Sequence, residues 1–228
     1  AVFKKDIIKY FVANGNSTIQ ELAKDTLLSV PTVTKAVTEL IELGYIVEYG
    51  KQETSEGRRP ILYGLNPESG FFVGVEIKVD FINLGLMNFR GDMVELDDNV
   101  PCRVDNTMES VEDLCRLVKQ FIDKSEVDKN RIQNIMFCIS GRVNSATGYS
   151  HTLYNFSEQP LTRLLSDILG YRVDIENDTR AFAYGEYTKG VVRGERDVLF
   201  INASWGLGLG IIVDGELYRG KAGFAGEF

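Results

Sequence analysis

The stretch "RVDIENDTRAFAYGE", residues 172–186, predicts a strand that turns directly into a helix. Residues 173–175 form a strand-like run, the polar pair Asn177-Asp178 follows, and a helix-like segment begins at once. Two interpretations of Asp178 follow from the residues alone. Its carboxylate could cap the following helix, or it could contact a ligand at the end of the strand.

The chain on either side of this stretch alternates strand-like and helix-like segments. Upstream, "SVEDLCRLVKQFIDKS" is an amphipathic helix, and "IQNIMFCISG" is a buried strand that ends at Gly141. Downstream, "DVLFINAS" is a strand, "SWGLGLG" is a glycine turn, and "IIVDGELYRG" is a hairpin with Asp214-Gly215 at its tip. This pattern predicts an α/β domain.

Residues 1–66 have a different pattern, which predicts three short helices and a hairpin. The second helix opens with Ser17, and Gln20 three residues later gives a capping-box pattern. The third helix begins at the N-cap Ser29 and carries Pro31 in its first turn. Its spacing places four apolar residues inward, namely Val33, Val37, Leu40 and Ile41. This order is typical of a winged helix-turn-helix, a DNA-binding fold.

Short polar residues on the third helix are the candidate DNA contacts, because they let a helix enter the major groove and hydrogen-bond bases or phosphates. The basic pair in the hairpin tip could reach the minor groove or the backbone. The candidates are Ser29, Thr32, Thr34, Lys35 and Thr38 on the helix, and Arg58 and Arg59 on the wing. The alternative is that these are solvated faces of a protein-interaction module.

Composition sets limits on function. The net charge of −8 falls on residues 67–228, because residues 1–66 carry equal numbers of acidic and basic side chains. DNA binding must therefore come from local basic groups. The three separated cysteines indicate reduced thiols in a cytoplasm, and the lone His151 cannot build a metal cluster. No apolar run is long enough for a membrane span.

Taken in order, several motifs resemble the ROK family of sugar kinases and sugar-responsive repressors. They are the winged helix, "FVGVEIKVDFINLGLMNFRGDMV", "SGRVN", "ENDTRAFAYGE", "WGLGLGIIVDGEL" and "GFAGEF". The resemblance implies a two-lobed, actin-like (ribonuclease H-like) fold with a sugar cleft. We expect a winged-helix domain at 1–66, a first lobe at 67–175, and the incomplete start of a second lobe at 176–228. We expect no cofactor in this chain, because the family's zinc loop would lie beyond Phe228.

The resemblance also implies site residues. In the family, the pair matching Asn177 and Asp178 binds sugar hydroxyls, and in its kinases the Asp is the catalytic base. By the same resemblance Gly141 and Arg142 border the sugar, and Glu227 hydrogen-bonds it.

Two departures from the kinase pattern argue against an enzyme. Residues 76–79 read Glu-Ile-Lys-Val where kinases have a glycine-rich phosphate turn, and Trp205 stands where they have a small threonine. We therefore predict a bacterial, cytoplasmic transcriptional repressor, without catalytic residues, that binds operator DNA and a sugar or sugar phosphate. We expect a homodimer or higher homo-oligomer that contacts no membrane. The alternatives are an ATP-dependent sugar kinase with an added DNA-binding head, and a protein-interaction module with vestigial sites.

Overall fold

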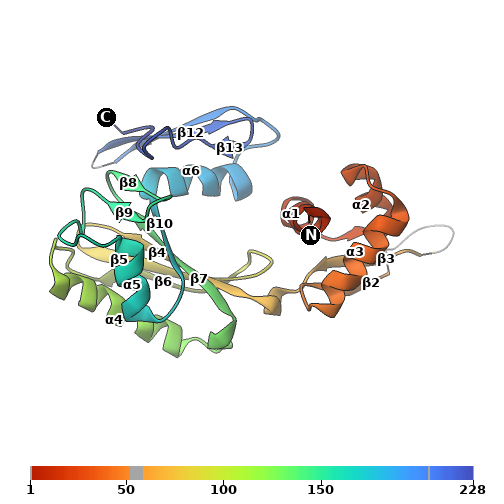
Figure 1. Ribbon diagram of the computed structural model, residues 1–228, viewed down its shortest axis with the longest axis horizontal. Coiled ribbons are helices and arrows are strands. Elements are labelled where there is room, and N and C mark those ends of the chain that lie inside the picture. The colour runs from red at the N-terminus through yellow and green to blue at the C-terminus, as the bar shows by residue number, and fades with distance from the viewer. Residues whose placement is uncertain (1, 52–58, 205, 228) are drawn as a thin grey trace. The chain divides into compact units, whose positions relative to one another are not determined.

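The computed structural model describes residues 2–51, 59–204 and 206–227. The chain divides into two compact units, and each is described by itself. The first unit comprises Ala1–Gly70 and Met87–Asp92, and the second comprises Phe71–Leu86 and Met93–Phe228. Figure 1 labels the elements of both units.

The first unit is a winged helix-turn-helix (Figure 1). Its helices are α1 (Val2–Asn14), α2 (Ile19–Thr26) and α3 (Val30–Glu42). A three-stranded sheet in the order β1-β3-β2 completes it, with β1 Ser17–Thr18, β2 Ile46–Lys51 and β3 Ile61–Leu65. The core gathers one face of each helix and both wing strands: Ile7, Phe11, Leu22, Ala23, Val33, Ala36, Val37, Leu40, Ile46 and Leu65.

The helix starts of this unit follow from local hydrogen bonds. The capping box of α2 is formed by Thr18 and Glu21, so the expected box at Ser17 and Gln20 is wrong by one residue. Ser17 instead pairs in β1, where its neighbour Thr18 is also buried. Ser29 caps α3 as expected, through the backbone N–H of Thr32 at 3.3 Å. The predicted inward position of Ile41 is wrong, since 36% of that residue is exposed.

The first unit also contains a hairpin tip that comes later in the chain, Met87–Asp92. Residues 87–92 connect β5 (Phe81–Asn88) to β6 (Met93–Pro101). The ring of Phe89 lies 5.6 Å from that of Tyr45, and its backbone N–H donates to the carbonyl of Pro67, in the 3-10 turn Pro67–Ser69. Phe89 therefore packs on the core of the winged helix.

The second unit is built on a five-stranded sheet in the order β10-β7-β4-β5-β6. Strands β10 (Val173–Asn177) and β4 (Phe71–Ile77) both run parallel to β7 (Ile132–Ile139), which lies between them. Helices α4 (Met108–Lys124) and α5 (Leu161–Leu169) share one apolar core with this sheet, with a 3-10 turn at Lys129–Arg131 between α4 and β7. Parallel strands joined through helices make this the expected α/β fold.

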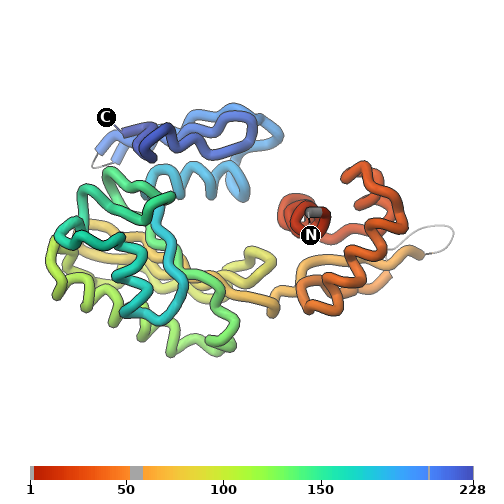
Figure 2. The backbone as a smooth tube through the Cα atoms, viewed as in Figure 1, coloured from red at the N-terminus to blue at the C-terminus, as the bar shows by residue number. Residues whose placement is uncertain are grey.

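The chain passes from β10 straight into α6 (Asp178–Lys189), as the tube in Figure 2 shows. Helix α6 packs against a second sheet, β11 (Val198–Ala203), β12 (Leu207–Val213) and β13 (Glu216–Leu217), in the order β11-β12-β13. The small hairpin β8 (Val143–Asn144) and β9 (Tyr149–Ser150) follows β7. The carboxyl ends of β7 and β10 therefore lie next to α6.

The expected glycine turn at "SWGLGLG" is wrong for the residues from 207 onward, which form strand β12. Within that strand a Cβ at Gly208 would lie 2.4 Å from Oγ1 of Thr179, and one at Gly210 would lie 2.2 Å from Cβ of Ala183. These two glycines let α6 approach the sheet closely, so their role in the fold is packing.

Candidate functional site

The cluster at the end of β10 begins with the residue that caps α6. Asn177 has extended backbone angles, and its side-chain oxygen accepts from the backbone N–H of Arg180 at 2.9 Å. The interpretation of Asp178 as the cap is therefore wrong, because Asn177 is the last extended residue and Asp178 is already the first helical one.

The carboxylate of Asp178 is partly exposed next to the end of β7. One oxygen accepts from the Ser140 hydroxyl at 2.6 Å, and the other accepts from the backbone N–H of Thr179 at 2.7 Å. The Thr179 hydroxyl also donates to the second oxygen, at 3.4 Å. A carboxylate oxygen can accept two hydrogen bonds, so the oxygen that accepts from Ser140 has room for one more. Asp178 is thus held in place by Ser140 and Thr179 and keeps acceptor capacity for a further group.

The side-chain amide of Asn177 ties together two of the other residues expected at the site, Gly141 and Glu227. Its Nδ2 donates to the carbonyl of Gly141 at 3.0 Å and to Oε1 of Glu227 at 2.9 Å. Asn177 is 3% exposed, and both of its amide hydrogens are used. In this arrangement Asn177 positions Gly141 and Glu227.

Glu227 brings a second carboxylate near Asp178. Burial raises the pKa of the Glu227 carboxyl above its usual value, Arg180 opposes that rise, and Asp178 adds to it. A carboxyl group whose charge is poorly compensated is a good acceptor for hydroxyl donors. Glu227 and Asp178 therefore form an acidic pair beside the Gly141 backbone.

Close backbone approaches shape the walls of this cluster. Gly141 has φ of +86°, and a Cβ there would lie 2.6 Å from Oγ1 of Thr152. The same Thr152 oxygen accepts from the backbone N–H of Arg142 at 3.0 Å, while the Arg142 residue is exposed. Gly226 has φ of +87°, and a Cβ there would overlap the carbonyl of Leu209. Thr152 was missed by sequence reasoning, since a lone threonine in a loop carries no signal.

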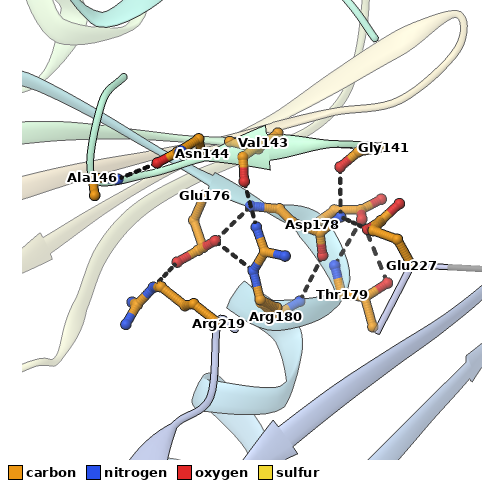
Figure 3. A network of polar contacts seen from close by, with 11 residues as sticks. Gly141, Val143, Asn144, Ala146, Glu176, Asp178, Thr179, Arg180, Arg219 and Glu227 are labelled. Atoms are coloured by element: carbon orange, nitrogen blue, oxygen red, sulfur yellow. Dashed lines mark hydrogen bonds and ion pairs between the residues drawn. The ribbon is translucent and has the colours of Figure 1, made fainter. Parts of the chain in front are cut away.

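A buried ion network supports the cluster from beneath (Figure 3). Arg180 is 1% exposed, and its guanidinium donates to Oε1 of Glu176 at 2.8 Å and to the carbonyl of Val143 at 2.9 Å. The second oxygen of Glu176 accepts from Arg219 at 2.8 Å. Burial alone would raise the pKa of Glu176, but Arg180, the backbone N–H of Asn177 and Arg219 together outweigh it, so the pKa lies below its usual value. The network joins β10, α6, β8 and the segment after β13.

Residues 76–79, where the sequence lacks the phosphate turn of kinases, hold an ion pair. Nζ of Lys78 lies 2.5 Å from Oε1 of Glu76, and Nδ2 of Asn83 donates to the other Glu76 oxygen at 2.7 Å. Lys78 also closes the β4–β5 connection through its backbone N–H to the carbonyl of Phe81. Trp205 lies outside the described residues.

The structure describes most of the DNA-contact candidates, and three of them lie on the exposed side of α3. Thr34, Lys35 and Thr38 are exposed, and Ser29 is the exposed N-cap, while Thr32 is half-buried. On the wing, Arg59 is exposed, and Arg58 lies outside the described residues.

Among the described residues, no group of three or more His, Cys, Asp or Glu side chains is arranged to hold a metal ion. Over the same ranges, no helix combines the length and the apolar character that a membrane crossing requires.

Comparison with known proteins identifies the class of the molecule. Residues 72–228 match the ROK family, and residues 3–47 match a winged helix-turn-helix DNA-binding family. The chain belongs to the ROK family, since that match covers more than half of it, and it carries an N-terminal winged helix.

Three curated relatives are transcriptional regulators. The xylose repressor of Bacillus subtilis is 28% identical over 99% of this chain and 59% of its own length. The xylose repressor of Caldicellulosiruptor bescii is 31% identical over 97% of this chain and 56% of its length. The regulator NagC of Escherichia coli is 25% identical over 91% and 51%. The chain thus spans about half to three fifths of the length of these relatives.

Solved structures agree on the fold. A ROK family transcriptional regulator, described as a homologue of the E. coli MLC protein, has a TM-score of 0.76 at 23% identity and covers 99% of this chain and 58% of its own. A ROK family glucokinase from Streptomyces griseus, solved with glucose and AMPPNP, has a TM-score of 0.59 at 28% identity and covers 70% of this chain and 49% of its own. The actin-like fold of the second unit is therefore the one that the sequence predicts.

Proposed function

We propose that this chain is the DNA-binding and effector-sensing part of a sugar-responsive transcriptional repressor. The observation that carries the proposal is the combination of a winged helix-turn-helix with a ROK domain in one chain. Relatives that match between 91% and 99% of this chain are named xylose repressor or N-acetylglucosamine repressor.

The proposed effector site is the acidic cluster at the end of β10. Asp178 and Glu227 would accept hydrogen bonds from sugar hydroxyls, and the Gly141 backbone with the Arg142 side chain would border the ring. A sugar and a sugar phosphate are both compatible with Arg142, whose guanidinium pairs with phosphate oxygens. Binding would change operator affinity only if the sugar prefers one of two states of the protein.

The proposed DNA site is α3 with the wing. Arg59 and Lys35 supply local positive charge in an acidic chain, and such charges contribute the salt-dependent part of DNA affinity. We further propose a homodimer, because helix-turn-helix regulators bind two-fold related half-sites with matching protein symmetry.

We propose that the chain does not phosphorylate its sugar. The Glu76–Lys78 ion pair occupies the β4–β5 connection, and a lysine held by a carboxylate is less available to a phosphate. The competing function is an ATP-dependent sugar kinase, favoured by the similarity to a glucokinase and by Asp178, whose carboxylate could act as a base.

One experiment separates the two functions. A duplex selected from a random library by the protein is titrated with it, with and without D-xylose, N-acetylglucosamine and their phosphates. The repressor function predicts that one of these compounds changes duplex affinity and that ATP with magnesium does not alter the compound. Phosphorylation of the sugar, measured by coupled ADP release, would instead establish the kinase.

A further inference from the structure

The exposed side of α3 has fewer free hydrogen-bond donors than its sequence suggests. The hydroxyl of Thr34 donates to the carbonyl of Val30 at 2.8 Å, and the hydroxyl of Thr38 donates to the carbonyl of Thr34 at 2.9 Å. Both are bonds from a side chain to the backbone one turn earlier, a pattern in which the helix itself satisfies the hydroxyl. The hydrogens of Thr34 and Thr38 are therefore already used inside the helix.

The cap uses up further hydroxyl groups. The Ser29 oxygen accepts from the backbone N–H of Thr32 and shares a hydrogen bond of 2.8 Å with the Thr32 hydroxyl. Only one of these two hydroxyl hydrogens stays available. The remaining strong donor among the candidate residues of this helix is the ammonium of Lys35.

With the hydroxyl groups turned toward the backbone, methyl groups form the outer surface of this side of α3. Since each oxygen of Thr34 and Thr38 is held against the backbone, the methyl carbon forms the outer part of these two exposed side chains. Val30 is 48% exposed at the first position of the helix, and Pro31 beside it is exposed too. Helical spacing places these residues on one stripe, since 30, 34 and 38 are four apart and 31 is three from 34.

This methyl stripe, Val30, Pro31, Thr34 and Thr38, is at the end of the helix that such folds insert into DNA. Recognition helices contact base edges with their N-terminal residues. From Val30 to Thr38 the stripe covers eight helical steps, about 12 Å along the axis, which is about three to four base-pair steps. In the major groove, the base-edge group that favours an apolar partner is the thymine C5-methyl.

We infer that α3 reads thymine methyl groups through this stripe. Its threonines contact the bases through their methyl groups, by van der Waals packing, and do not donate hydrogen bonds to them. The inference rests on the proposed DNA binding and specifies its chemistry. It gives Thr34 and Thr38 a different role from the one expected from the sequence. It also adds Val30 and Pro31 to the candidate DNA contacts, which the sequence analysis limited to polar and charged residues.

The test uses two changes at Thr34 that separate methyl from hydroxyl. Thr34→Val keeps the methyl and removes the hydroxyl, while Thr34→Ser keeps the hydroxyl and removes the methyl. A duplex is selected from a random library with the unchanged protein. Each thymine in it is then replaced by deoxyuridine, which removes only the C5-methyl, and affinities are measured by fluorescence anisotropy at one salt concentration.

The expected pattern is a coupling between one thymine and Thr34. Removing that methyl from the DNA should weaken binding of the unchanged protein and of Thr34→Val by about fourfold, the equivalent of one buried methyl group. Thr34→Ser should bind the thymine duplex about fourfold more weakly and should be insensitive to deoxyuridine at that position. Melting curves of both variants check that the helix is intact.

Three results would overturn the inference. If Thr34→Val weakens duplex binding while Thr34→Ser binds like the unchanged protein, the Thr34 hydroxyl matters and the methyl does not. If no deoxyuridine replacement weakens binding of a tightly bound duplex, α3 does not read thymine methyl groups. If the protein selects no duplex at all, the proposed DNA-binding function fails and the inference falls with it.

Discussion

Replacing Glu176 by Gln should remove about 3–5 kcal/mol from the stability of the second unit, because it leaves Arg180 buried without the carboxylate to which it is hydrogen-bonded. The two side chains are 7% and 1% exposed and lie 2.8 Å apart. An arginine cannot give up its proton inside a protein, so the charge stays and must be solvated by the fold. One guanidinium nitrogen of Arg180, Nη1, already has no hydrogen-bond partner among the described residues.

The magnitude follows from the bonds that Glu176 accepts. Its carboxylate accepts hydrogen bonds from Nε of Arg180, Nε of Arg219 and the backbone N–H of Asn177, at 2.8, 2.8 and 2.9 Å. A hydrogen bond to a charged group contributes roughly 1.5–3 kcal/mol, and Gln keeps one acceptor oxygen while it turns an amide toward the other donor. The half-exposed Arg219 can turn to water, so most of the loss comes from Arg180.

The assay is urea unfolding followed by circular dichroism, with calorimetry to separate the transitions of the two units. The matched control is Asp167→Asn, which breaks an exposed pair with Arg163 at the same i,i+4 spacing and 3.0 Å, and should cost about 0.5 kcal/mol or less. A loss from Glu176→Gln no larger than that of the control would refute the reasoning.

The pH dependence gives a second check with a defined sign. Burial raises the pKa of Glu176, but the hydrogen bonds from Arg180, the Asn177 backbone and Arg219 together outweigh it, so the pKa in the folded protein lies below the usual 4.5. The contribution of this group to stability is therefore fully present above pH 4.5 and is lost as the pH falls through the folded pKa. The difference in unfolding free energy between the unchanged protein and Glu176→Gln should therefore become smaller as the pH falls from 4.5 through the folded pKa of Glu176.

Three further outcomes are expected. Asp178→Asn should lower effector affinity about ten- to hundredfold by removing a charged acceptor, measured as sugar-dependent duplex release, and an intact response would remove Asp178 from the site. Gly210→Ala should cost about 1–3 kcal/mol in urea unfolding because its Cβ would lie 2.2 Å from that of Ala183, whereas Gly74→Ala, which meets no atom within 4 Å, should change little; equal losses would contradict the packing role. Arg59→Ala should lower the log–log salt slope of duplex binding by about one, and an unchanged slope would show that Arg59 contacts no phosphate.

Local signals in the sequence were enough for the winged helix. Ser29 and Pro31 mark the start of α3 because a cap and a first-turn proline act within four residues of the chain. The capping box of α2 was displaced by one residue, since both Ser17 and Thr18 can cap. The choice between them is made by the pairing of β1 with β3, and that contact is distant in sequence.

The site was less predictable, because its geometry depends on contacts across the fold. The polar pair after β10 is visible in the sequence, but which member caps α6 depends on where the strand ends. The packing role of the glycines in β12 was equally hard to predict, since the α6 residues that they contact come about 30 residues earlier in the sequence. The pair Glu176 and Arg180 has helical spacing, yet its burial depends on Val143 and Arg219.

The end of β10 joins the stability of the second unit to its proposed sensing role. Glu176 holds the buried arginine, and the next residue, Asn177, bonds both the Gly141 carbonyl after β7 and the Glu227 carboxylate near the end of the chain. A ligand that takes hydrogen bonds from both of these segments would therefore act on contacts that already hold them together. Because a ligand shifts an equilibrium only by its differential affinity, the Asn177 bonds are where a sugar could favour one arrangement of the two segments over another. Substitutions at Glu176 should accordingly change effector affinity as well as stability, whereas Asp167→Asn should leave effector affinity unchanged and cost about 0.5 kcal/mol of stability or less.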